Sequence, residues 1–209
     1  MTELAIDIDS SDRARGRPPG NAAPLFGLPR TMPLVLDLDG TLIRGDLLYK
    51  SFFSILRRNP LVAVSCAGWL VRGRAALKRQ LALRNHIDWS TIAFHQDVVA
   101  VAEREKAAGR RVVLATAADA MLASQVAALF PCIDQVFASD GEHNLKGSNK
   151  ADLLRRAFPQ GFIYAGDSKS DLAVWAQAAG VMTVNARASV RNAARALGKP
   201  ALHLPGRVG

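Results

Sequence analysis

The stretch Pro33-Leu-Val-Leu-Asp-Leu-Asp-Gly-Thr-Leu42 (PLVLDLDGTL) decides the fold. An apolar run of buried-strand type ends at two carboxylates one residue apart, so we predict a strand that delivers Asp37 and Asp39 to its carboxyl end. Strand side chains alternate between faces, so both carboxylates lean the same way while Leu38 packs on the other side. Two like charges this close repel each other unless a cation or a proton lies between them. The alternative is a simple turn, because Asp-Gly-Thr is also ordinary turn chemistry.

Further along the chain, short apolar runs alternate with helical patterns. We predict four more strands, at residues 111–115, 134–138, 162–166 and 181–185. We predict helices at residues 89–108, from about 120 to 130, at 148–158 and from about 168 to 179. This alternation is typical of a parallel sheet with helices on both faces, in which ligands bind beyond the carboxyl ends of the strands. The predicted fold class is therefore α/β, a Rossmann-like three-layer α/β/α arrangement.

Three segments are expected along the chain. Residues 1–31 mix Asp, Ser, Arg, Pro and Gly without a hydrophobic period, which predicts a disordered leader. Residues 46–86 have an irregular helical pattern and no strand pattern, so we expect a helical cap inserted after the first strand. The core domain is then formed by residues 32–45 and 87–209.

Composition narrows the class of protein. A chain of 209 residues that is 49% hydrophobic can bury one sizeable core. Cys66 and Cys132 lack metal-type spacing, and the first residues do not resemble a cleavable signal, so we expect a cytoplasmic protein. The net charge of +9 is uneven, with nine Lys or Arg against one acid between Arg44 and Arg84. This favours an anionic partner such as a phosphorylated metabolite, a lipid headgroup or nucleic acid.

One uncharged stretch within the expected cap, residues 60–71, has two interpretations. As a helix its twelve residues would span only about 18 Å, which is too short to cross a bilayer. It either forms the packed interior of the cap or, with the flanking Arg57, Arg58, Arg72 and Arg74, rests on a membrane surface or binds a lipid-like substrate. The second interpretation predicts peripheral association with the inner face of a membrane.

The carboxylates at the predicted strand ends indicate a metal site. Asp37 and Asp39 follow the first strand, and Asp167 and Asp171 follow the fourth. Four carboxylates in one crevice repel strongly, and their hard oxygen atoms suit Mg²⁺. Asp167 and Asp171 lie one helical turn apart and can face the same ion. The alternative is structural, with Asp167 as a helix cap and Asp171 as a first-turn acid favoured by the helix dipole.

Two neighbouring acids with different roles suit phosphoryl transfer. Asp37 can attack phosphorus to form an acyl phosphate, and Asp39 can protonate the leaving oxygen and then deprotonate the attacking water. Thr116, with Ala117 beside it, can hold a phosphoryl oxygen, although a threonine at a strand end is often only structural. A lysine would offset the charge of the transition state. We prefer Lys146 to Lys150 because Lys146 precedes the predicted helix and lies nearer the crevice.

These motifs resemble the haloacid dehalogenase (HAD) superfamily of phosphatases. The resemblance rests on a DxDGT motif at residues 37–41, a strand-ending Thr116, a loop lysine and a GDxxxD motif at residues 166–171. It implies a sheet of strand order 5-4-1-2-3, an aspartyl-phosphate intermediate, and Mg²⁺ held by Asp37, the Asp39 carbonyl and Asp167, with Asp171 supporting the metal. It also implies that the helical cap closes over the substrate. The acid at Asp39 favours a phosphatase or a phosphomutase over a dehalogenase.

A narrower resemblance concerns the partner. The stretches LATAAD, ASDGEHNLKGSNKADLL and YAGDSKSDLAVW are similar to the soluble N-terminal half found fused to UbiA-type prenyltransferases. This implies a lipid or isoprenoid phosphate as substrate, or a role as a membrane-associated partner of a prenyltransferase. We expect a phosphatase acting on a phosphomonoester. A nucleic-acid binder is a third class, but the sequence has no aromatic-interleaved basic motif and no zinc spacing.

Overall fold

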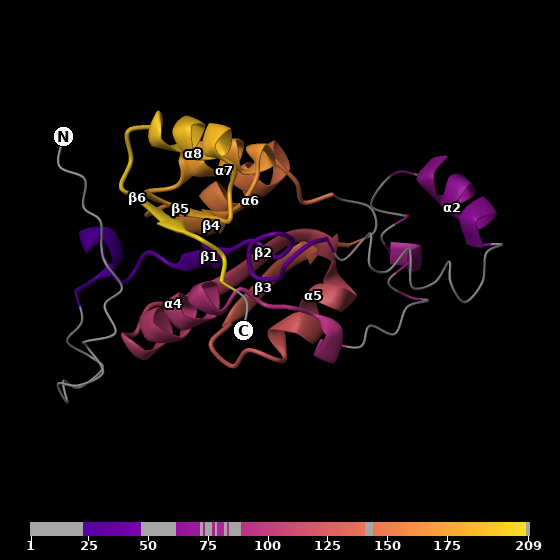
Figure 1. Cartoon of the computed structure of the whole chain (residues 1–209), viewed down its shortest axis with the longest axis horizontal. Coiled ribbons are helices and arrows are strands. Elements are labelled where there is room, and N and C mark those ends of the chain that lie inside the picture. The colour runs from indigo at the N-terminus through magenta and orange to yellow at the C-terminus, as the bar shows by residue number, and fades with distance from the viewer. Residues whose placement is uncertain are drawn as a thin grey trace.

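The centre of the protein is a parallel sheet of six strands in the order β3-β2-β1-β4-β5-β6 (Figure 1). The computed structural model describes residues 23–46, 62–71, 73, 77, 79–81, 83, 89–140 and 144–207. The strands are β1 (Leu34–Leu36), β2 (Val112–Asp119), β3 (Gln135–Ser139), β4 (Ile163–Gly166), β5 (Gly180–Val184) and β6 (Ala201–Leu204). The α/β fold class is confirmed, and the expected order of the first five strands is the observed one.

The sheet is covered by helices on both faces. The α-helices of the core are α4 (Gln96–Ala107), α5 (Ala120–Ala127), α6 (Ser148–Ala157), α7 (Leu172–Gln177) and α8 (Ala188–Arg195). Helices α4 and α5 lie on one side of the sheet, and α6, α7 and α8 lie on the other (Figure 1). Each side has its own apolar cluster, one containing Val98 and Leu122 and the other Leu154 and Trp175. Burial on both faces explains why the strands read as continuous apolar runs.

The edge strand β6 was missing from the sequence prediction. It pairs in parallel with β5, with Met182 opposite Leu202. Only four residues long, it is largely exposed, and only Leu204 is buried. A short edge strand buries too little apolar surface to give a clear pattern in the sequence.

Two other boundaries differ from the prediction. The helix expected at 89–108 begins at Gln96, after a 3-10 turn η4 (Trp89–Thr91). Strand β2 continues to Asp119, with a register shift against β3 between Ala115 and Asp119. The residues expected to leave the sheet after Ala115 are therefore extended and bulged, which aims them at the crevice.

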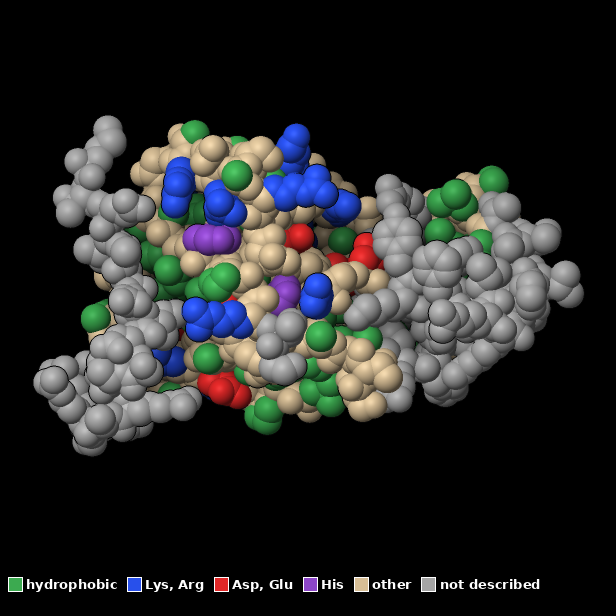
Figure 2. Space-filling model, viewed as in Figure 1, with side chains coloured by type: hydrophobic (Ala, Val, Ile, Leu, Met, Phe, Trp, Pro, Cys, Tyr) green, Lys and Arg blue, Asp and Glu red, His purple; other side chains and the backbone are tan. Residues whose placement is uncertain are grey.

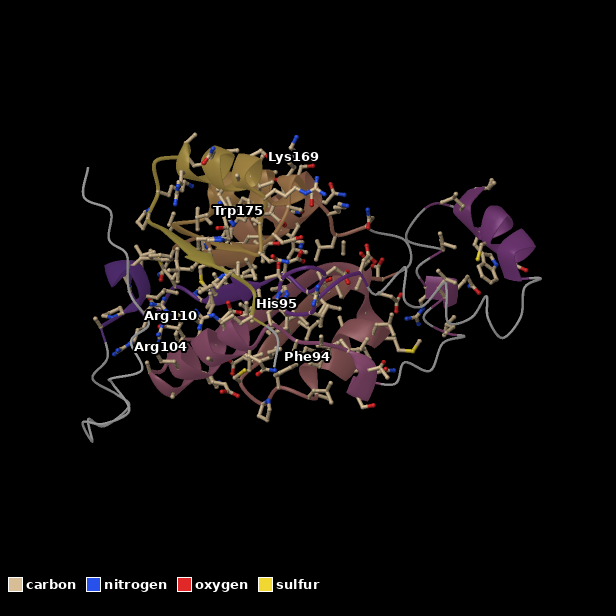
Figure 3. All side chains as sticks on the ribbon, viewed as in Figure 1. Phe94, His95, Arg104, Arg110, Lys169 and Trp175 are labelled. Atoms are coloured by element: carbon tan, nitrogen blue, oxygen red, sulfur yellow. The ribbon has the colours of Figure 1, made fainter. Side chains whose placement is uncertain are left out.

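Part of the expected disordered leader packs against the core. Residues 23–31 include the 3-10 turn η3 (Leu25–Gly27), whose Leu25 is buried. The Arg110 side chain, which is fully buried, donates to the carbonyls of Leu28 (3.1 Å), Pro29 (2.8 Å) and Met32 (2.6 Å) and to Glu105 Oε2 (2.8 Å). Figure 3 labels Arg110 at this end of the sheet. Residues 1–22 lie outside the described part of the chain.

Within the expected cap, the structure describes helix α2 (Val62–Val71) and a few later residues. Cys66 and Leu81 are buried and pack with Trp69 and Leu77 in a small apolar cluster. Leu70 and Val71 are 53% and 89% exposed. Figure 1 shows α2 at the opposite end of the molecule from η3. Among the described residues, no helix is both long enough and apolar enough to cross a membrane. Apart from these residues and Asp46, residues 46–86 lie outside the described part of the chain.

Candidate active site

A pocket of about 410 Å³ opens at the carboxyl ends of the central strands. Its lining brings together segments that are distant in the sequence: the loops after β1 and β4, the end of β2 with the start of α5, the start of α6 with the residues before it, and Leu81 of the expected cap. The residues that line it are Asp37, Asp39, Gly40, Gly45, Asp46, Leu81, Ala117, Ala118, Asp119, Leu122, Asn144, Lys146, Gly147, Lys150, Asp167, Ser168, Ser170 and Asp171. Figure 2 shows Asp and Glu side chains at the end of the core nearest α2. This is the edge where the rule for parallel sheets puts the ligand.

Asp37 lies at the bottom of this pocket, directly after β1. Its backbone N–H donates to the Ala165 carbonyl of β4 (3.0 Å), which fixes the main chain, and its side chain is buried. Lys150, from the first turn of α6, donates to Asp37 Oδ1 at 2.6 Å and is itself only 3% exposed. Burial raises the pKa of Asp37 and the nearby Asp171 adds to this, whereas Lys150 acts in the opposite direction. The buried pair is a charge-assisted hydrogen bond in a site of low dielectric.

The turn after β4 holds Asp171 in place. Asp171 Oδ2 accepts from the N–H groups of Asp167 (3.1 Å) and Ser168 (2.9 Å) and from Ser168 Oγ (3.0 Å). Asp171 Oδ1 accepts from the Tyr164 hydroxyl at 3.0 Å. Ser168 and Asp171 form a capping box around the 3-10 turn η5 (Lys169–Asp171). Because Asp171 accepts from four donors, it stabilises the turn, and it also places a negative charge next to Asp37 and Asp167.

Asp167 carries the clearest electrostatic signature of the site. Burial, together with the negative charges of Asp171 and Asp37, raises its pKa from 3.8 to about 7. One oxygen from each of Asp37, Asp167 and Asp171 lies within 4.8 Å of the other two. Hard carboxylate oxygens this close suit Mg²⁺, which would relieve the repulsion that now favours a proton on Asp167. The donor set therefore fits the metal that the sequence predicts.

The structure places Asp39 and Ala117 at the pocket surface, whereas Thr116, also near the end of β2, is buried. Asp39 is partly exposed and lines the pocket, whereas Leu38 between the two acids is fully buried in the apolar cluster, as the alternation predicts. Ala117 lines the pocket. Thr116 is fully buried beneath it, and its Oγ1 accepts from the Ala118 N–H at 2.9 Å. Thr116 keeps its hydroxyl hydrogen for one donated bond.

The two lysines occupy different environments. Lys146 is exposed and lines the pocket, while Lys150 is buried against Asp37. The sequence-based preference for Lys146 rested on its place before the predicted helix, near the crevice, whereas Lys150 falls in the first turn. The first turn of α6 instead aims Lys150 at the strand ends. The sequence analysis did not single out Tyr164. The available signal was a hydroxyl-bearing residue within the apolar run 162–166, three residues before Asp167.

Comparisons with known proteins bear on the family and the fold. The family model described as haloacid dehalogenase-like hydrolase matches residues 34–175. The protein y4nM of Sinorhizobium fredii (strain NBRC 101917 / NGR234), named uncharacterized, is 36% identical over 155 residues. The match covers 74% of this chain but only 30% of y4nM, so the chain spans less than a third of that relative.

Solved structures share the fold at low identity. A protein of unknown function from Bordetella pertussis Tohama I has a TM-score of 0.60 at 16% identity, with 82% of this chain and 98% of that chain covered. A substrate-bound phosphoserine phosphatase complex has a TM-score of 0.57 at 13% identity, with 85% and 94% covered. A phospho-aspartyl intermediate analogue of phosphoserine phosphatase gives 0.55 at 14% identity, with 85% and 95% covered. At such low sequence identity, these TM-scores show a shared fold and nothing about activity.

The repulsion at Asp167 predicts a pH-dependent response to Mg²⁺. With a pKa of about 7 in the folded state against 3.8 ordinarily, Asp167 binds a proton in the folded state that the unfolded chain has lost. The metal-free protein should therefore lose stability as the pH rises between these values. Because Mg²⁺ needs the ionised carboxylate, 5 mM Mg²⁺ should raise Tm more at about pH 8 than at about pH 5.5, measured by calorimetry.

Asp167→Asn is the matched variant for this measurement. This substitution removes the titrating carboxylate. The stability of the metal-free variant should therefore no longer fall as the pH rises from 3.8 to about 7, and Mg²⁺ should raise its Tm much less. An equal rise of Tm at both pH values in the unmodified protein would contradict the account.

Proposed function

Because the chain belongs to the haloacid dehalogenase-like hydrolase family, we propose that it is a Mg²⁺-dependent phosphatase that hydrolyses a phosphomonoester through an aspartyl phosphate on Asp37. The observation that carries this proposal is the buried Asp37 beside Lys150, in the same pocket as Asp167 and Asp171. Asp37 lines the pocket and contacts the Lys150 ammonium group, so its carboxylate can be reached by a substrate in the pocket. A carboxylate that served only the fold would be enclosed.

The reaction has two displacements at phosphorus. Asp37 attacks, so that a bond forms between its carboxylate oxygen and phosphorus while the ester P–O bond breaks. Asp39 gives its proton to the leaving oxygen and then takes one from the water that attacks the aspartyl phosphate. This second displacement releases inorganic phosphate and restores Asp37. The partly exposed position of Asp39 in the pocket suits an acid that must reach both the leaving group and water.

The other residues hold the phosphoryl group. The Lys150 ammonium offsets negative charge next to Asp37, and the Thr116 hydroxyl and Ala117 bind phosphoryl oxygens from the end of β2. Asp37, Asp167 and the Asp39 carbonyl would hold Mg²⁺, with Asp171 in support. Bound there, Mg²⁺ would supply positive charge against the phosphoryl oxygens. Lys146 lies at the exposed part of the pocket, where it can attract an anionic substrate.

A lipid or isoprenoid phosphate is the finer proposal for the substrate. The specific observation in its favour is α2, whose ten residues are uncharged and whose Leu70 and Val71 are exposed. Apolar side chains on a helix between basic stretches suit the surface of an anionic membrane. Peripheral membrane association and contact with a prenyltransferase follow from the same proposal. A phosphomutase, which would pass the phosphoryl group to a second hydroxyl, uses the same aspartyl phosphate.

We predict that Asp37→Asn abolishes turnover. The amide cannot act as the nucleophile, so phosphate release from p-nitrophenyl phosphate with Mg²⁺ should fall by about 10⁴-fold or more. Asp152→Asn, which changes an exposed acid on α6, is the control and should leave the rate unchanged. Circular dichroism shows whether both variants are folded. Equal activity of folded Asp37→Asn and the unmodified protein would exclude Asp37 as the nucleophile.

The two lysines give a second prediction. Lys150→Met should lower kcat by about 100-fold, because it removes the buried cation that contacts Asp37. Lys146→Met should raise KM by less than about tenfold and leave kcat nearly unchanged, since an exposed charge contributes mainly to substrate attraction. The reverse ranking of the two variants would restore Lys146 as the active-site lysine.

A panel of substrates tests the finer proposal. We expect polyprenyl phosphates to be hydrolysed with a higher kcat/KM than sugar phosphates, and the protein to sediment with vesicles that contain anionic lipid. Replacing Leu70 and Val71 by Ser should reduce sedimentation and leave hydrolysis of p-nitrophenyl phosphate intact. A preference for small sugar phosphates without vesicle binding would exclude the lipid proposal. Phosphorylated product without free phosphate would indicate a phosphomutase.

A further inference from the structure

One buried side chain at the site has no role in the mechanism above. Tyr164, in the middle of β4, is fully buried, yet it carries a hydroxyl among apolar neighbours. That hydroxyl lies 2.9 Å from Lys150 Nζ and 3.0 Å from Asp171 Oδ1. The Lys150 ammonium also lies 5.4 Å from the centre of the Tyr164 ring. A hydroxyl is costly to bury unless it is hydrogen-bonded, and both of these bonds lead into the pocket.

The direction of the two hydrogen bonds follows from the groups involved. A lysine ammonium can only donate, and an ionised carboxylate can only accept. The single phenolic hydrogen therefore goes to Asp171, and the phenolic oxygen accepts from Lys150. Burial, together with the charges of Asp171 and Asp37, raises the pKa of Tyr164 well above 10, so the hydroxyl keeps its hydrogen. The order of donors is fixed, from Lys150 through Tyr164 to Asp171.

Tyr164 itself is held rigidly. Its strand lies between β1 and β5, with Tyr164 opposite Val35 on one side and Val181 on the other. The indole N–H of Trp175 donates to the Tyr164 carbonyl at 3.2 Å. Trp175 is labelled in Figure 3. A lysine side chain has four flexible bonds, and a single contact with Asp37 would leave its ammonium group free to swing. A second acceptor on a rigid strand defines one position for it.

We propose that Tyr164 is a positioning residue, whose hydroxyl fixes the Lys150 ammonium against Asp37 and joins it to the Asp167–Asp171 turn. This inference rests on the proposed phosphatase function and deepens it. Tyr164 does not touch the substrate. It acts through Lys150, so its effect on the rate must depend on the presence of Lys150.

A double-mutant cycle tests this dependence. Tyr164→Phe keeps the ring and removes only the hydroxyl, and it should lower kcat by about 10- to 100-fold, as for one hydrogen bond to a charged group, with KM changed less than about twofold. In the Lys150→Met background the same change should alter kcat by less than about twofold. Val181→Ala, which makes a cavity in the same cluster without touching Lys150, is the control and should leave kcat unchanged.

A second measurement is independent of turnover. In the metal-free protein, proton–nitrogen NMR spectra of the lysine ammonium groups should contain a protected signal that is absent from Lys150→Met. That signal should persist in Val181→Ala and broaden or disappear in Tyr164→Phe. Its loss would show that the hydroxyl restrains the ammonium group in the absence of metal and substrate.

The outcomes separate this inference from the proposed function. Equal losses caused by Tyr164→Phe in the two backgrounds, or an unchanged ammonium signal, would overturn the positioning role while the phosphatase activity stands. Absence of turnover in the unmodified protein would overturn the proposed function, and the NMR comparison would still decide whether Tyr164 restrains Lys150.

Discussion

The repulsion among three carboxylates at the carboxyl ends of β1 and β4, two of them buried and Asp167 partly buried, is the constraint on which the site depends. Asp37, Asp167 and Asp171 have oxygens within 4.8 Å of one another, and the buried Lys150 contacts only Asp37 among them. Burial, together with the charges of Asp171 and Asp37, raises the pKa of Asp167 to about 7. The hydrogen bonds that Asp171 accepts at the end of β4, together with the Lys150–Asp37 contact, offset part of the repulsion between these like charges. A bound cation would turn the same repulsion into affinity.

The main chain makes this close approach possible at two glycines. A Cβ atom on Gly40 would lie 2.3 Å from Asp167 Oδ2, and one on Gly166 would lie 2.7 Å from Asp171 Cγ. Both distances are shorter than atoms tolerate, and Gly40 also has a φ of 77°, where side chains are disfavoured. The glycines of the DxDGT and GDxxxD motifs therefore serve one purpose: they let the loops after β1 and β4 bring their acids together.

The sequence was informative where a short-range pattern sufficed. The strands β1, β2, β4 and β5 are apolar runs that are largely buried, and β3 is a partly buried edge strand with an apolar centre. The acids at the strand ends belong to local motifs, so the strands and the positions of these acids could be predicted. The burial of Lys150 could not be predicted, because it depends on contacts with Asp37 and Tyr164, which are distant in the sequence. The same is true of residues 23–31, a short segment interrupted by two prolines, whose carbonyls accept from the buried Arg110. Long-range hydrogen bonds of this kind leave no periodic pattern.

The central claim is that Asp37 becomes covalently phosphorylated. Its most direct test is to mix the protein with Mg²⁺ and substrate, quench with acid during turnover, and map the modified residue by mass spectrometry. The account predicts one added phosphoryl group on the peptide that contains residues 33–42, located at Asp37 and removed by hydroxylamine, which cleaves acyl phosphates. Phosphate release without any phosphorylated peptide, or a phosphoryl group on another residue, would contradict it.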